Sequence, residues 1–250
     1  MKPNLLLLGG TTEGTRLGRV LGEAGVGGTV SLAGRVADPA AQGLPMRQGG
    51  FGGTEGLADW LRGRGITHVI DATHPFAAQI SANAVQACAM TGLPLIALTR
   101  PAWQRKAGDD WTHVPDIADA VRALAGPPRR VMLALGRMHL PDFVVHRQHF
   151  YLLRLVDPPA RPPDFPSHHA IIDRGPFTTA GDIALMRQHR IDLVLSKNSG
   201  GAGAYAKIEA ARALGLPVLM IDRPAMPPRR EVHSINEVLR WLHDGTERGV

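Results

Sequence analysis

A run of four leucines that leads into two glycines constrains the fold of this chain more than any other feature. Leu5–Leu8 predicts a short strand buried on both faces, as in a parallel sheet. Gly9 and Gly10 permit a tight turn, and residues 15–21 continue with helical spacing. A strand, a glycine turn and a helix N-terminus place free backbone N–H groups and a positive dipole end around one point. The segment therefore predicts a phosphate-binding site.

The glycines of this turn match part of the dinucleotide fingerprint G-x-G-x-x-G. Gly9 and Gly14 fit its first and last glycines, whereas Thr11 stands where the middle glycine belongs. A threonine there limits how closely the backbone can approach a pyrophosphate, although its hydroxyl could donate to a phosphate oxygen. The alternative is an ordinary turn between a strand and a helix.

The position after the second expected strand bears on the identity of the nucleotide. Residues 28–33 read as that strand, which ends at Gly34 and Arg35. In dinucleotide folds an acidic residue about 20 positions beyond the glycines binds the ribose of NAD, whereas an arginine accommodates the 2′-phosphate of NADP. Arg35 holds this place, which favours NADP(H). The alternative is a solvated loop arginine.

Composition favours a globular protein with an anionic ligand. The formal net charge of +6 suits a phosphorylated cofactor or a polycarboxylate, although a high arginine content alone would also produce it. Aromatic residues make up 5% of the chain and do not alternate with basic clusters, so nucleic acid is not an expected partner. No apolar run approaches a membrane span or a signal peptide, so no membrane association is expected.

Several chemistries can be set aside. Cys88 is the only cysteine and lies in an apolar helical stretch, so we expect packing there rather than a nucleophile. No clustered Cys/His spacing predicts a metal, and a reducing cytoplasm is the expected compartment. The chain lacks the serine-hydrolase elbow, the H-E-x-x-H helix and the short-chain dehydrogenase Tyr–Lys dyad. The reactive centre should therefore belong to a cofactor.

The two halves of the chain resemble each other. Residues 92–101 match residues 215–224, and the strand at Leu5–Gly9 recurs at Met132–Gly136 with nearly the same spacing. We interpret this as an α/β protein with two similar Rossmann-like domains, whose parallel sheets face a central cleft. Tandem prolines within 125–130 mark the linker, which divides the chain into domains 1–126 and 127–250. The segment 231–233 stays unassigned and could pair back with the first sheet.

Two polar loops follow expected strands and are candidates for ligand contact. In Asp71–Ala77 the proline fixes an extended loop, so that Thr73 and His74 would point toward a ligand; helix capping is the alternative. Ser196–Gly203 combines a lysine, amide and hydroxyl groups and several glycines at a helix start, which suits an anion. The turn at 173–178 adds a cation and an aromatic face.

The ordered set of motifs at 8–14, 71–77, 174–177 and 196–201 resembles the precorrin-6A reductase family. The resemblance spans nearly the whole chain. It implies an enzyme of cobalamin biosynthesis that uses a reduced nicotinamide to reduce the C18=C19 double bond of precorrin-6A, giving precorrin-6B. The substrate would be a tetrapyrrole polycarboxylate, and Arg35 would favour NADPH as the cofactor.

The resemblance also implies roles for individual residues. The cofactor would contact Arg35 and the residues of three loops: Gly9, Gly10, Thr11, Thr12, Glu13, Gly14, Thr73, His74, Pro75, Lys197, Asn198, Ser199, Gly200 and Gly201. The last of these loops, at 197–201, would touch the cofactor phosphates, the macrocycle carboxylates or both. The macrocycle would contact Arg137, Arg174, Phe177 and Lys207. His74, Lys197 or water would supply the proton that completes the reduction, and no metal is implied. Two rivals stay open, a non-catalytic NADP-binding sensor and an NADH-dependent reductase of the cobalt-loaded analogue. A monomer is compatible with the sequence, which does not decide the oligomeric state.

Overall fold

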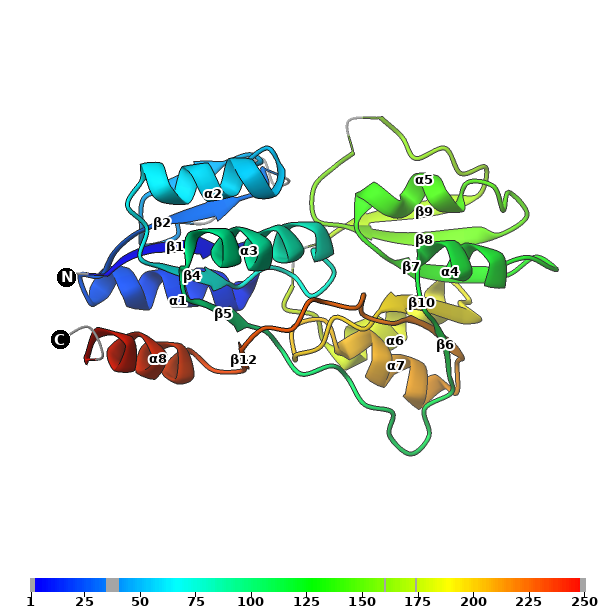
Figure 1. The fold of residues 1–250 in the computed structure, drawn as a ribbon. Helices are drawn as coiled ribbons and strands as arrows, with labels where there is room; N and C mark the ends of the chain where they lie inside the picture. The colour runs from blue at the N-terminus through cyan, green and yellow to red at the C-terminus, as the bar shows by residue number, and fades with distance from the viewer. Residues whose placement is uncertain (1–2, 35–40, 160, 174, 248–250) are drawn as a thin grey trace. The chain divides into compact units, whose positions relative to one another are not determined.

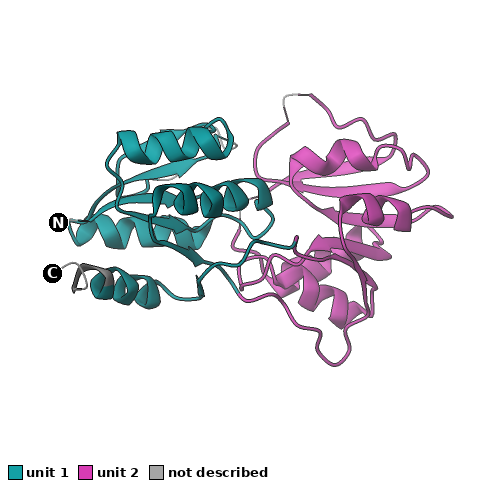
Figure 2. Ribbon diagram, in the orientation of Figure 1, with its two compact units in different colours: residues 1–100, 225–250 teal, residues 101–224 magenta. Residues whose placement is uncertain are grey.

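The computed structural model describes residues 3–34, 41–159, 161–173 and 175–247. The chain forms two compact units, one of residues 1–100 with 225–250 and one of residues 101–224 (Figure 2). Each unit contains one six-stranded sheet with helices on both faces, and all the strand pairs are parallel (Figure 1). The expected α/β architecture with two parallel-sheet units is thereby confirmed.

The first unit has the strand order of a dinucleotide-binding fold. Its sheet runs β12-β5-β4-β1-β2-β3, which corresponds to the order 3-2-1-4-5-6 of doubly wound sheets read from its other edge. The elements are β1 (Asn4–Leu8), α1 (Thr12–Glu23), β2 (Gly27–Leu32), β3 (Met46–Gln48), α2 (Gly53–Gly63), β4 (His68–Asp71), α3 (Ala78–Thr91), β5 (Leu95–Leu98), β12 (Glu231–Val232) and α8 (Ile235–Glu247).

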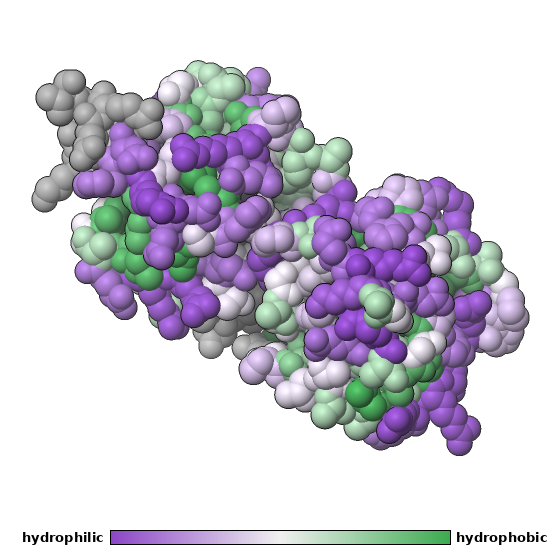
Figure 3. All heavy atoms as spheres, turned by 90° about the horizontal axis from the view of Figure 1, so that it is seen from below, coloured by the Kyte–Doolittle hydropathy of each residue, from purple (hydrophilic) through white to green (hydrophobic). Residues whose placement is uncertain are grey.

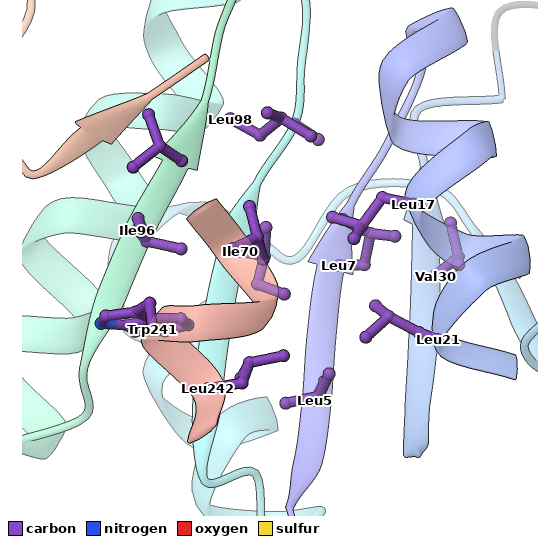
Figure 4. Close-up of a cluster of buried hydrophobic side chains, with 13 residues drawn as sticks. Leu5, Leu7, Leu17, Leu21, Val30, Ile70, Ile96, Leu98, Trp241 and Leu242 are labelled. Carbon is purple, nitrogen blue, oxygen red and sulfur yellow. The ribbon is translucent and has the colours of Figure 1, made fainter. Parts of the chain in front are cut away.

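The four leucines of β1 explain why this strand lies at the centre of its sheet. Side chains alternate between the faces of a strand, so Leu5 and Leu7 enter the core beneath α1 and α8, together with Trp241 (Figure 4). Leu6 and Leu8 point the other way and pack beneath α2 and α3. All four are at most 1% exposed, as expected for a strand covered on both faces.

The second unit repeats this plan, with the strand order β6-β11-β10-β7-β8-β9. Met132, Leu152 and Val194 from its central strands pack against Ile208. The elements are β6 (Trp111–Val114), α4 (Ile117–Ala123), β7 (Arg130–Ala134), η1 (Arg137–His139), α5 (Leu140–Phe143), β8 (Phe150–Leu155), β9 (His168–Ile172), α6 (Thr179–Gln188), β10 (Leu193–Lys197), α7 (Ala206–Leu214) and β11 (Val218–Ile221).

The units do not divide at residues 126 and 127, where the sequence pattern placed the boundary. β6 lies before that point but pairs with β11 of the second sheet, and β12 lies after it but pairs with β5 of the first. The repeated halves therefore each supply the outermost strand of the other half's sheet. The pairing of segment 231–233 with the first sheet, which the sequence left open, is thus found in the structure. The placement of β6 in the second sheet was not predicted, because the pairing partner of an edge strand is set by tertiary packing.

The surface is mixed in character. On the face shown in Figure 3, hydrophilic residues are interspersed with small apolar areas in both units. Across the described part of the chain, no helix is long and apolar enough to span a bilayer.

Candidate functional site

The glycine turn after β1 is built around the start of α1. Gly10 has a φ of +116°, a conformation that side-chain-bearing residues rarely adopt, and a Cβ there would meet nothing within 4 Å. Thr11 is the N-cap of α1, because its Oγ1 accepts a hydrogen bond from the N–H of Gly14 at 3.0 Å. The N–H groups of Thr12 and Glu13 precede the first intrahelical bond, which Thr15 donates to the Thr11 carbonyl. The turn thus presents backbone donors beside a positive helix end.

The second predicted loop lies directly against this turn. The Thr11 hydroxyl donates to the carbonyl of Ala72 at 2.8 Å, and a Cβ on Gly14 would lie 3.3 Å from both the Cβ and the oxygen of Ala72. Gly14 therefore permits the close contact between helix and strand that the last glycine of the fingerprint provides. Because its proton is committed to Ala72, the Thr11 hydroxyl acts as a cap and a tie in this structure. Donation from this hydroxyl to a phosphate oxygen, which the sequence suggests, would require the hydrogen bond to Ala72 to break.

Asp71, at the end of β4, organises the loop that follows. Its side chain is 1% exposed, and its Oδ1 accepts hydrogen bonds from the backbone N–H and the hydroxyl of Thr73, at 3.0 and 2.7 Å. Its Oδ2 accepts from Ser81 in the first turn of α3 and from Arg229. A buried carboxylate needs such compensation, and here the partners fix the path of the loop.

His74 and Pro75 follow within the same loop. The N–H of Phe76 donates to Nδ1 of His74 at 3.2 Å, and the imidazole is half-buried. Because Nδ1 acts as an acceptor, the neutral ring carries its proton on Nε2. Pro75 is buried, which anchors the loop between Asp71 and α3. Nδ1 of His74 thus takes part in a hydrogen bond within the loop itself.

The corresponding turn in the second unit lacks the features of a nucleotide site. β7 is followed by a single glycine, Gly136, then by η1 and the four-residue α5. By contrast, β1 is followed by the twelve-residue α1 with its threonine cap. Only a longer helix adds an aligned dipole to its free N–H groups. Between these two turns, the geometry thus favours the first unit for the dinucleotide.

In the second unit, Trp103 and Arg223 hold the loop after β10, and neither was predicted to be a site residue. The Asn198 side chain accepts from the N–H of Trp103 at 2.8 Å and donates to the carbonyl of Trp103 at 3.0 Å. The Trp103 indole donates to the Gly201 carbonyl at 2.7 Å, and Arg223 donates to the carbonyls of Asn198 and Ser199. Asn198 is buried, so its amide shapes the loop through these contacts.

The glycines of this loop are required by its conformation. Gly200 and Gly201 both have a φ of +69°, and a Cβ on Gly200 would collide with the Pro101 carbonyl and with Arg223. Lys197, the last residue of β10, is half-buried. Arg137 is exposed after β7, the neighbouring strand, so both cations emerge at the carboxyl edge of one sheet. That edge is where parallel sheets bind ligands.

The other predicted substrate residues lie in different surroundings. Lys207 is 8% exposed, and its ammonium donates to the Ala204 carbonyl and lies 5.1 Å from the Trp103 ring centre. Phe177 is half-buried, with the guanidinium of Arg154 4.2 Å from its ring centre. Arg154 also pairs with the buried Asp182. Arg35 and Arg174 lie outside the residues that the structure describes.

Neither a thiol nucleophile nor a metal site accompanies these loops. Burial raises the pKa of the Cys88 thiol to about 12, so the group is protonated at neutral pH. Among the residues that the structure describes, no group of three or more His, Cys, Asp or Glu side chains could hold a metal ion. The polar loops instead fit a phosphate-bearing organic cofactor, because Gly10 leaves space over backbone donors at the N-terminus of α1.

The chain is similar to known reductases over nearly its whole length. The family model described as precorrin-6x reductase CbiJ/CobK matches residues 4–243. The precorrin-6A reductase of Rhodobacter capsulatus is 56% identical, over 98% of this chain and 99% of its own length. The cobalt-precorrin-6A reductase of Priestia megaterium is 30% identical, over 97% of this chain and 99% of its own.

A solved structure supports the same relationship. The structure of CobK precorrin-6A reductase superimposes with a TM-score of 0.91 at 56% identity, and the match covers 97% of this chain and 96% of that one. A family match across most of the chain and an identity this high leave no doubt about descent. The chain belongs to the precorrin-6x reductase family, CbiJ/CobK, and is an oxidoreductase of cobalamin biosynthesis.

Proposed function

We propose that this reductase uses NADPH to reduce the C18=C19 double bond of precorrin-6A, giving precorrin-6B. The observation that carries the proposal is the hydrogen bond between Thr11 and Ala72, because it joins the two predicted cofactor loops at the carboxyl edge of one parallel sheet. Membership of the family implies a nicotinamide cofactor. The preference for NADPH rests on the spacing of Arg35 from the glycine turn.

The glycine turn would hold the cofactor phosphates. Backbone N–H groups at Gly10, Thr12 and Glu13 lie beside the α1 N-terminus, which favours negative charge. Gly9 and Gly14 allow the close packing that keeps this turn in place, and Arg35 would bind the 2′-phosphate. When bound, NADPH supplies the hydride for the reduction.

Thr73, His74 and Pro75 would border the nicotinamide end of the site. The loop is fixed by the hydrogen bonds of Asp71 to Thr73, and the N–H of Phe76 donates to Nδ1 of His74. His74 is one candidate source of the proton that completes the reduction, and Lys197 and water are the others. The residues would act mostly by positioning, because the one thiol of the chain, that of Cys88, is buried and protonated.

The second unit would contribute to binding of the macrocycle carboxylates. Lys197 and Arg137 emerge from neighbouring strands, and the left-handed backbone at Gly200 and Gly201 can turn N–H groups toward an anion. Asn198 and Ser199 complete this loop, while Arg174, Phe177 and Lys207 are the further substrate contacts that we propose. Cations held in a site before the reaction stabilise charged groups without reorganisation.

The cobalt-free substrate is favoured over the cobalt-loaded one. The chain is 56% identical to a relative named for precorrin-6A and 30% identical to one named for cobalt-precorrin-6A. An assay of the purified protein with each macrocycle and each of NADPH and NADH tests the proposal. We expect the largest kcat/KM for precorrin-6A with NADPH. A larger kcat/KM with NADH or with the cobalt-loaded macrocycle would contradict it.

A further inference from the structure

A buried ion pair ties the C-terminal segment to the loop after β4. Nη1 of Arg229 donates to Oδ2 of Asp71 at 2.6 Å, although 158 positions separate the two residues in the chain. The Arg229 side chain is 7% exposed and that of Asp71 is 1% exposed. Arg229 also contacts Glu231, whose side chain is 42% exposed, at 3.1 Å. Both partners of the main pair are therefore removed from solvent, whereas Glu231 lies near the surface.

The carboxylate of Asp71 also accepts hydrogen bonds from residues of two other segments, the loop after β4 and α3. Oδ1 accepts hydrogen bonds from the N–H and the hydroxyl of Thr73. Oδ2, which accepts from Arg229, also accepts from the hydroxyl of Ser81 at 2.5 Å. The residue between Asp71 and Thr73 is Ala72, which accepts the hydrogen bond from Thr11. Movement of Asp71 would therefore disturb both the loop at 73–75 and the glycine turn after β1.

We propose that Arg229 is a positioning residue for the dinucleotide site, acting through Asp71. The inference rests on the proposed function, since it assigns the cofactor to these two loops. In this account the segment that returns to the first unit and forms β12 also completes the cofactor site, although it need not touch the cofactor. The guanidinium suits the task, because it offers several donors in a fixed plane.

Loss of Arg229 has a definite chemical consequence for the loop. A carboxylate left buried without its cation must turn toward water or take up a proton. Either response changes the acceptor that holds the N–H and hydroxyl of Thr73. The loop would then sample other conformations. Dinucleotide binding would have to order it, which would weaken the apparent affinity.

The first test uses the unaltered protein and no substrate. Hydrogen exchange of backbone amides is followed with and without NADPH, over residues 72–77 and over residues 229–233. We expect NADPH to slow exchange in both segments together, because the ion pair links them. Slower exchange at 72–77 with no change at 229–233 would overturn the proposal. If NADPH does not bind at all, the proposed function fails and not this inference alone.

The second test uses variants with a matched control. Arg229→Met removes the cation, and the double variant Asp71→Asn/Arg229→Met removes both charges, so that no unpaired charge is buried. Glu231→Gln alters the exposed partner of the same guanidinium and serves as the control. Dissociation constants for NADPH are measured by fluorescence, and kcat and KM are measured with precorrin-6A.

The expected results separate positioning from a purely structural role. We expect the dissociation constant and KM for NADPH to rise by about tenfold to a hundredfold in both Arg229 variants, as for other small misplacements of binding groups. KM for the macrocycle should change much less, and Glu231→Gln should stay within about twofold of the wild type. A folded double variant that binds NADPH as the wild type does would overturn the proposal, even if its melting temperature were lower.

Discussion

The hydroxyl of Thr11 donates a 2.8 Å hydrogen bond to the carbonyl of Ala72, so the turn after β1 and the loop after β4 form one structure. The same oxygen accepts from the N–H of Gly14 and caps α1. The Thr11 side chain thus orders the N-terminus of α1, which would face the cofactor phosphates, and also holds the loop after β4 in place. The proposed cofactor site depends on this double role of Thr11.

Removal of the Thr11 hydroxyl should weaken both folding and cofactor binding. Thr11→Val keeps the size of the side chain but loses the cap and the tie, which should lower the free energy of unfolding by about 1–2 kcal/mol. The dissociation constant for NADPH should rise as well. Thr11→Ser, which keeps the hydroxyl, is the control and should lie close to the wild type in both measurements. Equal effects of valine and serine would show that the hydroxyl is not responsible.

Reversal of the charge at residue 35 should change the cofactor preference. In Arg35→Glu we expect the affinity for NADPH to fall by a factor of about 10² or more, because a carboxylate replaces a cation at a phosphate, whereas the affinity for NADH should change little. Arg19→Glu makes the same charge change on the exposed side of α1 and controls for net charge. A parallel fall in both affinities, or no fall, would remove Arg35 from the 2′-phosphate site.

The indole of Trp103 should matter for the loop after β10. Trp103→Phe keeps an aromatic ring but loses the hydrogen bond to the Gly201 carbonyl, which should cost about 1 kcal/mol of stability. If the loop binds the substrate as proposed, KM for the macrocycle should increase more than KM for NADPH. Steady-state kinetics with each ligand varied in turn would measure both, and an unchanged macrocycle KM would count against a substrate role for this loop.

Cys88 should be chemically silent in the folded protein. Cys88 is 4% exposed, and burial raises the pKa of its thiol to about 12. A thiolate forms only as the pH rises toward that value, so a thiol reagent should react very slowly at pH 7 to 8 and quickly after unfolding in guanidinium. Cys88→Ala should leave the reductase activity intact. Rapid labelling of the native protein would show that the helix opens or that the thiol is exposed.

The exchanged edge strands make the two halves of the chain dependent on each other. A fragment of residues 1–126 retains β6 without its partner β11. It also lacks β12, which supplies Val232 to the first core, and α8, which supplies Val238, Trp241 and Leu242. We expect this fragment and residues 127–250 to be poorly folded alone and to regain structure when they are mixed. Circular dichroism and gel filtration would show this. A stable 1–126 fragment with a cooperative melting transition would contradict the interdependence.

Much of the fold could be predicted because local pattern and global packing agree. The run Leu5–Leu8 indicated a strand covered on both faces, and the alternation of its side chains between two cores confirms this. The internal repeat indicated two parallel-sheet units. The pairing of β12 with the first sheet was one possibility that the sequence offered. The division between the units was nevertheless predicted wrongly, because the pairing of β6 depends on contacts between residues more than 100 positions apart.

In the candidate site as well, features set by neighbouring residues in the sequence could be predicted, whereas contacts between distant residues could not. Short motifs revealed the glycine turn and both polar loops, since each combines special backbone needs with polar side chains. The residues that hold these loops, Arg229 and Trp103, gave no local signal, because their partners lie at Asp71 and Asn198. A charged residue such as Asp71 at the end of a buried strand was the one available sign that a distant partner was required.

The most direct test of the central claim is to follow the label from NADPH carrying deuterium at the transferable position of the nicotinamide. The label is traced in the macrocycle by mass spectrometry and NMR after incubation of the purified protein with precorrin-6A. We predict that one deuterium appears at the reduced C18–C19 bond while one NADPH is oxidised. Oxidation of NADPH without deuterium in the macrocycle, or deuterium at another carbon, would contradict the account.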